Sequence, residues 1–346
     1  MGRPISLGAR VGWYIFKNRV LKRRKFFPLV TMLEPLEACN LACEGCGRIR
    51  EYESVLNRRM SVEDALHAVE ESGAPIVSIA GGEPTIHPHI AEIVNEITAR
   101  GYYVYMCTNG LTMTKVMKNI KPSKYFAWVI HLDGTDERHD AAVSRKGVYK
   151  IAMRNAKTAI EAGYRVTGNT TLFKGSDRED LHSLWKKCAE MGFEGNMISP
   201  AYDYESVPNQ ELFLKKMDAI KVFKDILTPD PELGIKFYNN PLFLQFLKGE
   251  REYDTCTAYS NPTYTVMGWR NPCYPLADSH TQNLDEIMTA GLWEKYGNGD
   301  KDPRCANCML HCGFESATIF GALSSPKDAL ALVTSGAITK SGITAA

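Results

Sequence analysis

From Phe27 onward, short apolar runs alternate with amphipathic segments along the chain. The apolar runs predict strands, and the amphipathic segments predict helices because their apolar residues recur at i, i+3 and i+4. The predicted strands span residues 28–35, 75–80, 103–108, 125–132, 165–172 and 196–200. The predicted helices span residues 61–72, 89–100, 112–120, 147–162, 177–191 and 210–227. Six strand–helix units in succession predict an α/β fold, a partial (β/α)6 parallel barrel with its chemistry on loops at the carboxyl ends of the strands.

Boundary signals support these elements. Ser61-Val-Glu-Asp64 has the pattern of a capping box, and Gly73, Gly101 and Gly163 lie where three of the helices should end. Beyond about residue 200 the alternation of predicted strands and helices stops. Residues 228–241 are rich in Pro, Gly and Asn, which is typical of a linker. The predicted parts are a basic amphipathic segment (1–26), a core barrel (27–228), a cysteine-rich auxiliary region (229–320) and a tail expected to be mobile (321–346).

The composition indicates the class of protein and the cellular compartment. A chain of 346 residues with 44% hydrophobic and 23% charged residues is typical of a globular enzyme, and its net charge of +1 favours no class of partner. Its ten cysteines fall mostly in close-spaced groups, which indicates metal binding in a reducing compartment rather than disulfides. We see no signal peptide and no apolar window of about 18 residues, so we expect a cytoplasmic protein.

The first cysteine group follows the first predicted strand. Cys39, Cys43 and Cys46 have the spacing C-x3-C-x2-C. Thiolates are the preferred ligands of iron–sulfur clusters, and one tight loop can direct three of them at three irons of a [4Fe-4S] cluster. A structural zinc loop or three buried thiols are the alternatives.

A glycine turn with a carboxylate follows the second predicted strand, and polar residues or a thiol end the later ones, where a barrel places its cofactor and substrate contacts. These residues are Gly81, Gly82, Glu83 and Pro84 after the second strand, Cys107, Thr108 and Asn109 at the end of the third, Asp133 after the fourth, Asn169 on the fifth and Ser199 on the sixth. Two glycines allow a ligand to approach the backbone closely, and the carboxylate of Glu83 could bind an ammonium group. Ordinary turn chemistry is the alternative for each of them. Cys188, in contrast, lies within a predicted helix and is expected to be core packing.

A second cysteine group lies in the auxiliary region. Its members are Cys256, Cys273, Cys305, Cys308 and Cys312. Five cysteines are available for four ligand positions, and we favour the first four, with Cys312 as a spare. A zinc ribbon that serves folding alone would use the same residues and remains the alternative.

The N-terminal segment mixes basic and aromatic residues. The first 33 residues contain eight Lys or Arg and no acid, interleaved with residues such as Trp13 and Phe16. This composition suits a helix lying on an anionic membrane surface, at the inner face of the membrane. A helix that caps the barrel and leaves its basic side in solvent is the alternative. We do not expect a nucleic-acid partner.

The three-cysteine motif resembles that of the radical S-adenosylmethionine (SAM) superfamily, in which the open iron binds SAM. In that superfamily the residue before the third cysteine is usually aromatic, whereas here it is Gly45. The resemblance implies that Gly81-Gly82-Glu83-Pro84 contacts the methionine amino group and that Asp133 and Asn169 lie on the ribose and sulfonium side. The cysteines of the second group are similar to those of auxiliary-cluster domains, which implies a second iron–sulfur cluster.

A narrower resemblance covers roughly residues 8–320. The run Pro28-Leu-Val-Thr-Met-Leu-Glu-Pro-Leu36, the cysteine loop, Ser78-Ile-Ala-Gly-Gly-Glu-Pro84, Val104-Tyr-Met-Cys-Thr-Asn-Gly110, His131-Leu-Asp-Gly134 and Cys305-Ala-Asn-Cys308-Met-Leu-His-Cys312-Gly-Phe-Glu315 carry it. Together they resemble the adenosylhopane synthases (adenosyl hopene transferases) of hopanoid biosynthesis. The resemblance implies addition of the 5′-deoxyadenosyl radical of SAM to the exocyclic alkene of the triterpene diploptene, with electrons from a flavodoxin-type or ferredoxin-type donor.

Cys107 is the residue that we expect to end this reaction. Addition moves the unpaired electron to a tertiary carbon, and a thiol near the carboxyl end of the third strand could quench it by hydrogen transfer. A small buried residue filling the barrel is the alternative. Two other functions stay open: a different radical SAM enzyme with an auxiliary cluster, such as a peptide-modifying or dehydrogenating one, and a metal-binding module without activity.

Overall fold

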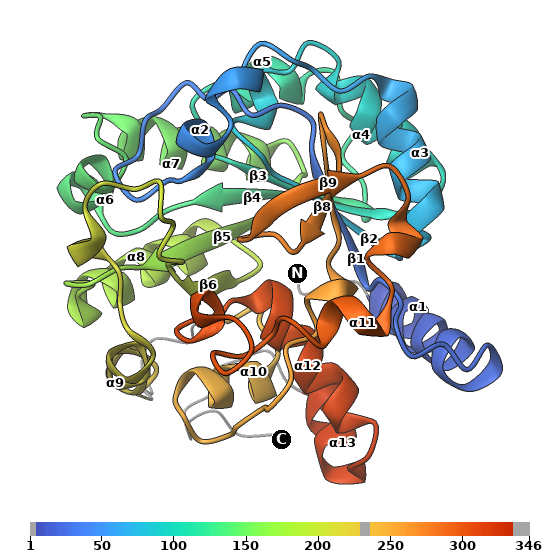
Figure 1. The fold of residues 1–346 in the computed structure, drawn as a ribbon. Coiled ribbons are helices and arrows are strands. Elements are labelled where there is room, and N and C mark those ends of the chain that lie inside the picture. The colour runs from blue at the N-terminus through green and yellow to red at the C-terminus, as the bar shows by residue number, and fades with distance from the viewer. Residues whose placement is uncertain (1–4, 229–235, 335–346) are drawn as a thin grey trace.

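The computed structural model describes residues 5–228 and 236–334. A parallel sheet flanked by helices forms its centre (Figure 1). The parallel strands are β1 (Val30–Glu34), β2 (Ile76–Ile79), β3 (Tyr103–Thr108), β4 (Phe126–His131), β5 (Arg165–Leu172) and β6 (Asn196–Pro200). They lie side by side in chain order, and each pairs with the next in parallel. The predicted α/β partial barrel is therefore confirmed.

The main helices of the barrel follow its strands. They are α3 (Val62–Ser72), α4 (Ile90–Ala99), α5 (Met113–Met117), α6 (Asp136–Ala142), α7 (Val148–Glu161), α8 (Arg178–Met191) and α9 (Lys216–Ile226). Ser61 caps α3 by accepting a hydrogen bond from the Asp64 amide (2.9 Å), and Gly73 ends it at φ +63°, a conformation that favours glycine. The last helix begins later than the predicted residue 210, because residues 210–212 form only a 3-10 turn.

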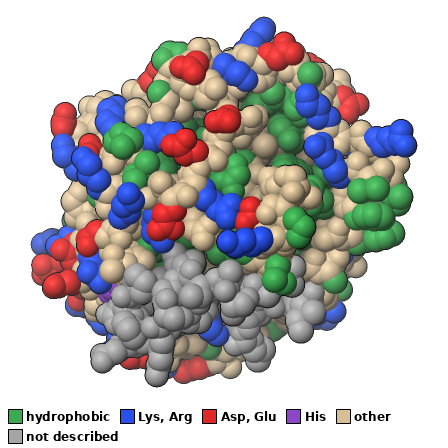
Figure 2. Space-filling view, turned by 90° about the horizontal axis from the view of Figure 1, so that it is seen from below, with side chains coloured by type: hydrophobic (Ala, Val, Ile, Leu, Met, Phe, Trp, Pro, Cys, Tyr) green, Lys and Arg blue, Asp and Glu red, His purple; other side chains and the backbone are tan. Residues whose placement is uncertain are grey.

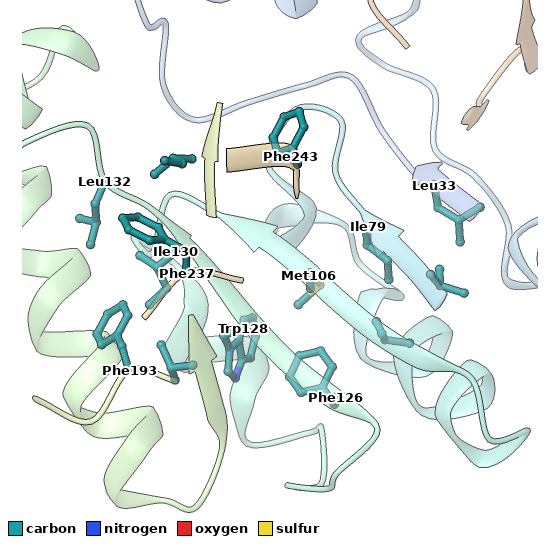
Figure 3. Close-up of a cluster of buried hydrophobic side chains, with 14 of the residues drawn as sticks. Leu33, Ile79, Met106, Phe126, Trp128, Ile130, Leu132, Phe193, Phe237 and Phe243 are labelled. Carbon is teal, nitrogen blue, oxygen red and sulfur yellow. The ribbon is translucent and has the colours of Figure 1, made fainter. Parts of the chain in front are cut away.

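Alternate residues of each strand face the helices and the barrel interior. Val104 and Met106 of β3 pack with Phe126, Trp128 and Ile130 of β4 against the helices (Figure 3). The intervening Tyr105 and Cys107 belong to a separate hydrophobic group on the opposite, inner face. Both faces of the strands are thus covered, which is why they read as continuous apolar runs.

The chain beyond β6 adds three more strands to the same sheet. They are β7 (Thr263–Thr265), β8 (Gly268–Pro272) and β9 (Ala277–Thr281). The first pairs in parallel with β1, with Met32 opposite Thr263, and the other two continue antiparallel. The sheet order is therefore β6-β5-β4-β3-β2-β1-β7-β8-β9. These strands join the auxiliary region directly to the barrel.

Four further helices belong to the described part of the chain beyond β6. They are α10 (Pro241–Leu247), α11 (Ala290–Trp293), α12 (His311–Ala322) and α13 (Pro326–Thr334). The last of them lies where we expected a tail, and Arg251 holds it through paired hydrogen bonds to Asp328 of 2.6 and 3.0 Å. Residues 229–235 of the predicted linker and residues 335–346 of the predicted tail lie outside the described residues.

The N-terminal helix α1 (Ile5–Phe16) closes the base of the barrel and continues as a π-helical turn, Lys17–Leu21. Leu7 packs against Tyr103 and Tyr105 on the inner face of β3. The Ser6 hydroxyl lies 2.6 Å from the Tyr103 hydroxyl, and Arg10 donates to the Gly101 carbonyl. The capping role that we considered for this segment is therefore present. In the described residues, no helix is both long and apolar enough to cross a membrane.

Candidate active site and its two cysteine groups

The three-cysteine loop, Cys39–Cys46, begins five residues after β1 and lies at the carboxyl end of the barrel. The Cys46 amide donates to the Cys43 carbonyl (3.2 Å), and Arg50 donates to the carbonyls of both residues. Burial, reinforced by the neighbouring thiols, raises the pKa of Cys39 to about 11 and of Cys43 to about 12. The three thiols are therefore close together, and iron would have to displace their protons on binding. This donor set fits a cluster held by three cysteines.

Phe173 occupies the space that the absent side chain of Gly45 leaves. A Cβ atom built on Gly45 would overlap the Phe173 ring, which follows β5 and lies 6.0 Å from the Phe213 ring. An aromatic ring therefore packs against the three-cysteine loop at this point, although the loop itself does not carry it.

The turn after β2 packs closely against the three-cysteine loop. The Gly82 amide donates to the Leu36 carbonyl and the Glu83 amide donates to the Ala38 carbonyl, both at 2.9 Å. A Cβ atom on Gly81 or Gly82 would overlap these carbonyls, so only glycine allows the approach. Pro84 starts the 3-10 turn that follows. These glycines thus support the loop, and contact with SAM stays a prediction.

The buried carboxylate of Glu83 is occupied mainly by the protein itself. Its Oε1 accepts from the Thr85 amide (3.0 Å), the Thr85 hydroxyl (2.5 Å) and the Thr108 hydroxyl (2.7 Å). Its Oε2 accepts from the Asn109 amide (2.8 Å) and retains capacity for a further donor such as an ammonium group. The Asn109 side chain also donates to Asn40 (2.7 Å). Glu83 therefore ties the ends of β2 and β3 to the three-cysteine loop.

Asp133 links the ends of β4 and β5. Its Oδ2 lies 2.8 Å from His131 Nε2, and its Oδ1 accepts from the Thr171 amide at 2.8 Å. Asn169 lies on the same barrel edge as His131, and among the described residues its side chain has no hydrogen-bond partner. The Ser199 hydroxyl donates to the Pro200 carbonyl beside it (3.1 Å). Asp133 lies close enough to Cys43 to raise the pKa of its thiol, and Asn169 lies opposite His131 on the neighbouring strand.

Cys107 lies on the inner face of β3, below this region. It pairs in register with Val129, so His131 lies two residues further along the neighbouring strand. Burial raises the pKa of the Cys107 thiol to about 12, although a hydrogen bond with the Ser78 side chain opposes the shift. The residue is partly accessible and is protonated at neutral pH. Cys188 is fully buried in α8 within the core, as expected.

The second cysteine group lines one pocket. Cys256, Cys273, Cys305, Cys308 and Cys312 all contribute to its wall. Gly313, in the first turn of α12, lies so close to Cys256 that a Cβ atom there would overlap the sulfur. Burial raises the pKa of Cys308 to about 12, and the neighbouring Cys305 adds to the shift. The five thiols share one pocket, so the geometry does not separate Cys312 from the other four.

The donor chemistry of this pocket fits an iron–sulfur cluster. Cys312 also packs with Met32, on the inner face of β1, so the pocket adjoins the barrel interior. In the described part of the chain, no three His, Cys, Asp or Glu side chains converge closely enough to hold a single metal ion.

A buried charge group beside the three-cysteine loop was not predicted. We use this term for Glu34, Glu37, Arg48 and Arg270, each at most 3% exposed. Arg270 pairs with Glu34, and Arg48 lies 3.7 Å from the same carboxylate. Both oxygens of Glu37 and one nitrogen of Arg270 have no hydrogen-bond partner among the described residues. Buried polar atoms are rarely left unpaired, so these atoms suit a bound polar group or water.

Both parts of the chain match known protein families or domains. Residues 33–187 match the model described as the radical SAM superfamily, and residues 196–332 match a domain of unknown function, DUF3463. An AdoMet-dependent heme synthase of Methanosarcina barkeri is 26% identical, over 52% of this chain and 56% of its own length. A GTP 3′,8-cyclase of Petrotoga mobilis is 24% identical, over 75% of this chain and 86% of its own. The chain spans about half the length of the curated relatives that it matches first.

Solved structures share the fold. SuiB of Streptococcus suis bound to its precursor peptide SuiA has a TM-score of 0.61 and 18% identity, over 83% of this chain and 70% of its own. SuiB bound to S-adenosylmethionine has a TM-score of 0.60 and 19% identity, over 88% and 76%. The matched domain implies a [4Fe-4S] cluster with SAM, and the second cysteine group is compatible with an auxiliary cluster. The three-cysteine loop lies inside residues 33–187, the part of the chain that the radical SAM superfamily model matches.

Proposed function

We propose that this chain is a radical SAM enzyme with two iron–sulfur clusters, in which Cys107 donates hydrogen to the substrate. Cys39, Cys43 and Cys46 would hold the first cluster, and the second cysteine group would hold the other. When bound, the reduced first cluster and SAM would supply a 5′-deoxyadenosyl radical. The observation that carries the proposal is the position of Cys107, a protonated and partly accessible thiol on the inner face of β3.

Cys107 suits hydrogen transfer for two reasons. Its raised pKa keeps the hydrogen on sulfur at neutral pH. An S–H bond is weaker than a tertiary C–H bond, so transfer of a hydrogen atom to a tertiary carbon radical is downhill. A donor fixed on one strand also reaches that carbon from one side, which sets its configuration. The transfer leaves a thiyl radical, and one electron from a low-potential donor together with one proton returns it to the thiol.

The substrate that we favour is the exocyclic alkene of diploptene, with adenosylhopane as the product. The combination of motifs around Cys39–Cys46, Cys107 and Cys305–Cys312 supports this choice, because together they resemble the adenosylhopane synthases. Addition to the terminal CH2 group forms one C–C bond and leaves a tertiary carbon radical. Cys107 lies on the inner face of β3, so a radical held beside it in the barrel would have a hydrogen donor.

A polar substrate is the second candidate. The buried charge group favours it, because Glu37 and Arg270 hold unpaired polar atoms that an apolar triterpene could not satisfy. The names of the relatives agree, since they include a GTP 3′,8-cyclase and an AdoMet-dependent heme synthase. Such an enzyme would use the same cysteines, with Cys107 or a substrate atom ending the reaction.

One anaerobic assay separates the two candidates. Reconstituted protein is incubated with SAM, dithionite and diploptene, and the products are read by mass spectrometry. An adenosyl adduct of the alkene as the main product supports the first candidate. Free 5′-deoxyadenosine, in the same amount with and without alkene, contradicts it and favours the second. No SAM cleavage at all contradicts both.

The role of Cys107 is tested in the same assay run in D2O. The thiol exchanges with solvent between turnovers, so the wild type should place one deuterium on the quenched carbon. Cys107→Ala should still cleave SAM and form the adduct, but with less saturated product, mixed stereochemistry or unsaturated by-products. Cys188→Ala is the matched control, because that thiol is buried in α8 away from the barrel interior. If the Cys107→Ala enzyme works at the wild-type rate and its product has the wild-type deuterium content and stereochemistry, the proposed role of Cys107 is contradicted.

A further inference from the structure

The outer face of α1 and the π-helical turn after it expose an unusual number of large apolar side chains. In the described part of the chain seven large hydrophobic side chains are exposed, and four belong to this one segment: Trp13 (61%), Phe16 (45%), Val20 (53%) and Leu21 (60%). The Trp13 and Phe16 rings stack with centroids 5.6 Å apart. Figure 2 shows hydrophobic side chains gathered at the right-hand edge, the side on which α1 projects in Figure 1, with Lys and Arg side chains nearby.

Six exposed cations follow closely in the chain. They are Lys17, Arg19, Lys22, Arg23, Arg24 and Lys25. The first 33 residues contain no acidic residue, and within the described residues none of the six forms an ion pair. This local charge contrasts with the whole chain, whose net charge is only +1. The positive charge is therefore unneutralised and lies beside the exposed aromatic pair.

The inner face of the same helix fixes this surface in place. Leu7 and Ile15 are buried, the second against Phe27. Asn18 donates to the Tyr14 carbonyl at 2.9 Å, which joins α1 to the π-helical turn. Contacts with the barrel thus position the helix before any partner arrives, and its outer apolar side chains are not used in folding.

We propose that the outer face of α1 and the turn after it (residues 13–25) dock on an anionic lipid bilayer. Aromatic and aliphatic side chains at a membrane interface enter the boundary between headgroups and acyl chains. Adjacent cations then lie among anionic headgroups, where each one strengthens binding by about fivefold at low salt. A second protein copy would also cover apolar residues, but six unpaired cations would repel those of an identical face. Charge complementarity therefore favours an anionic surface over a second copy.

The test uses full-length protein and sedimentation with vesicles of phosphatidylcholine alone or with one quarter phosphatidylglycerol. We expect binding to the mixed vesicles, weak binding to the neutral ones, and a loss in high salt because ions screen surface attraction. The variant Lys22→Gln/Arg23→Gln/Lys25→Gln should bind about a hundredfold more weakly. Lys118→Gln/Lys186→Gln/Lys187→Gln, which removes three exposed cations elsewhere, should bind like the wild type.

A second variant tests the apolar part. Trp13→Ser/Phe16→Ser changes only exposed side chains, so it should fold normally and still lose binding, whereas Met217→Ser, exposed on α9, should not. Equal binding of wild type to neutral and anionic vesicles would overturn the proposal, as would unchanged binding by both the apolar and the charge variant. Sedimentation equilibrium is run alongside: a dimer that the Trp13→Ser/Phe16→Ser variant abolishes would assign the face to a second copy instead.

Discussion

Replacing Glu83 by Gln should destabilise the protein well beyond what so small a change normally does. The carboxylate is 1% exposed and accepts four hydrogen bonds, three on Oε1 and one on Oε2. An amide can keep the three acceptor contacts only by placing its NH2 group against the Asn109 amide. One charge-assisted hydrogen bond, worth about 1.5–3 kcal/mol, is then lost. The Asn109 N–H is also left buried and unpaired, which costs a further ~1–3 kcal/mol.

We therefore expect a loss of about 3–5 kcal/mol in the free energy of unfolding. Urea unfolding of anaerobically reconstituted protein, followed by circular dichroism, measures it. Glu190→Gln is the control, because that carboxylate is exposed near the end of α8 and should change stability by less than about 0.5 kcal/mol. If Glu83→Gln unfolds at the same urea concentration as the control, the hydrogen-bond network around Glu83 does not hold the site together.

Three further outcomes follow from the site. Cys43→Ala should abolish SAM cleavage, because two thiolates leave no stable cluster site with a defined open iron, and substantial cleavage would contradict the assignment. Anaerobic reconstitution should yield more than about four irons per chain and Cys273→Ala should lower the count, whereas four irons in both proteins would indicate zinc or free thiols in the second group. Burial lowers the pKa of His139 to about 4, so its unfolded form takes up a proton below pH 6.5 before the folded form does. His139 should therefore contribute a loss of up to about 3 kcal/mol in stability from pH 7 to pH 4, and His139→Gln should make the pH slope shallower in thermal unfolding; an unchanged slope would contradict it.

The six barrel strands could be predicted because each is buried on both faces. Such a strand consists of consecutive apolar residues, which the sequence shows directly. Helix α6 could not, since Asp136–Ala142 is almost entirely polar and is held by the next helix, whose Tyr149 amide donates to Asp140. Strands β7–β9 are only three to five residues long. Pairing of β7 with β1 also joins residues more than 200 positions apart, which no local pattern reveals.

Some features of the candidate site could likewise be predicted from the sequence, and others could not. Close-spaced cysteines and the glycine turn are local features, and the structure brings Cys39, Gly82 and Glu83 together as their order along the barrel predicts. The buried charge group depends on tertiary contact, because Arg270 reaches Glu34 only through the added strands. One signal was available: Glu34 and Glu37 are charges inside or next to an otherwise apolar strand, and such residues are buried only when something pairs with them.

The packing of the Phe173 ring against Gly45 couples two positions that are 128 residues apart. Either side chain can fill the space against the three-cysteine loop, but both can be present only if the Phe173 ring moves, because a side chain on residue 45 overlaps the end of the ring. Variation at one position therefore constrains the other: an aromatic residue at 45 is best accommodated by a small residue at 173. Among homologues the two sites should covary. In a double-mutant cycle they should show strong positive epistasis, with each single exchange harmful and the paired exchange largely restored.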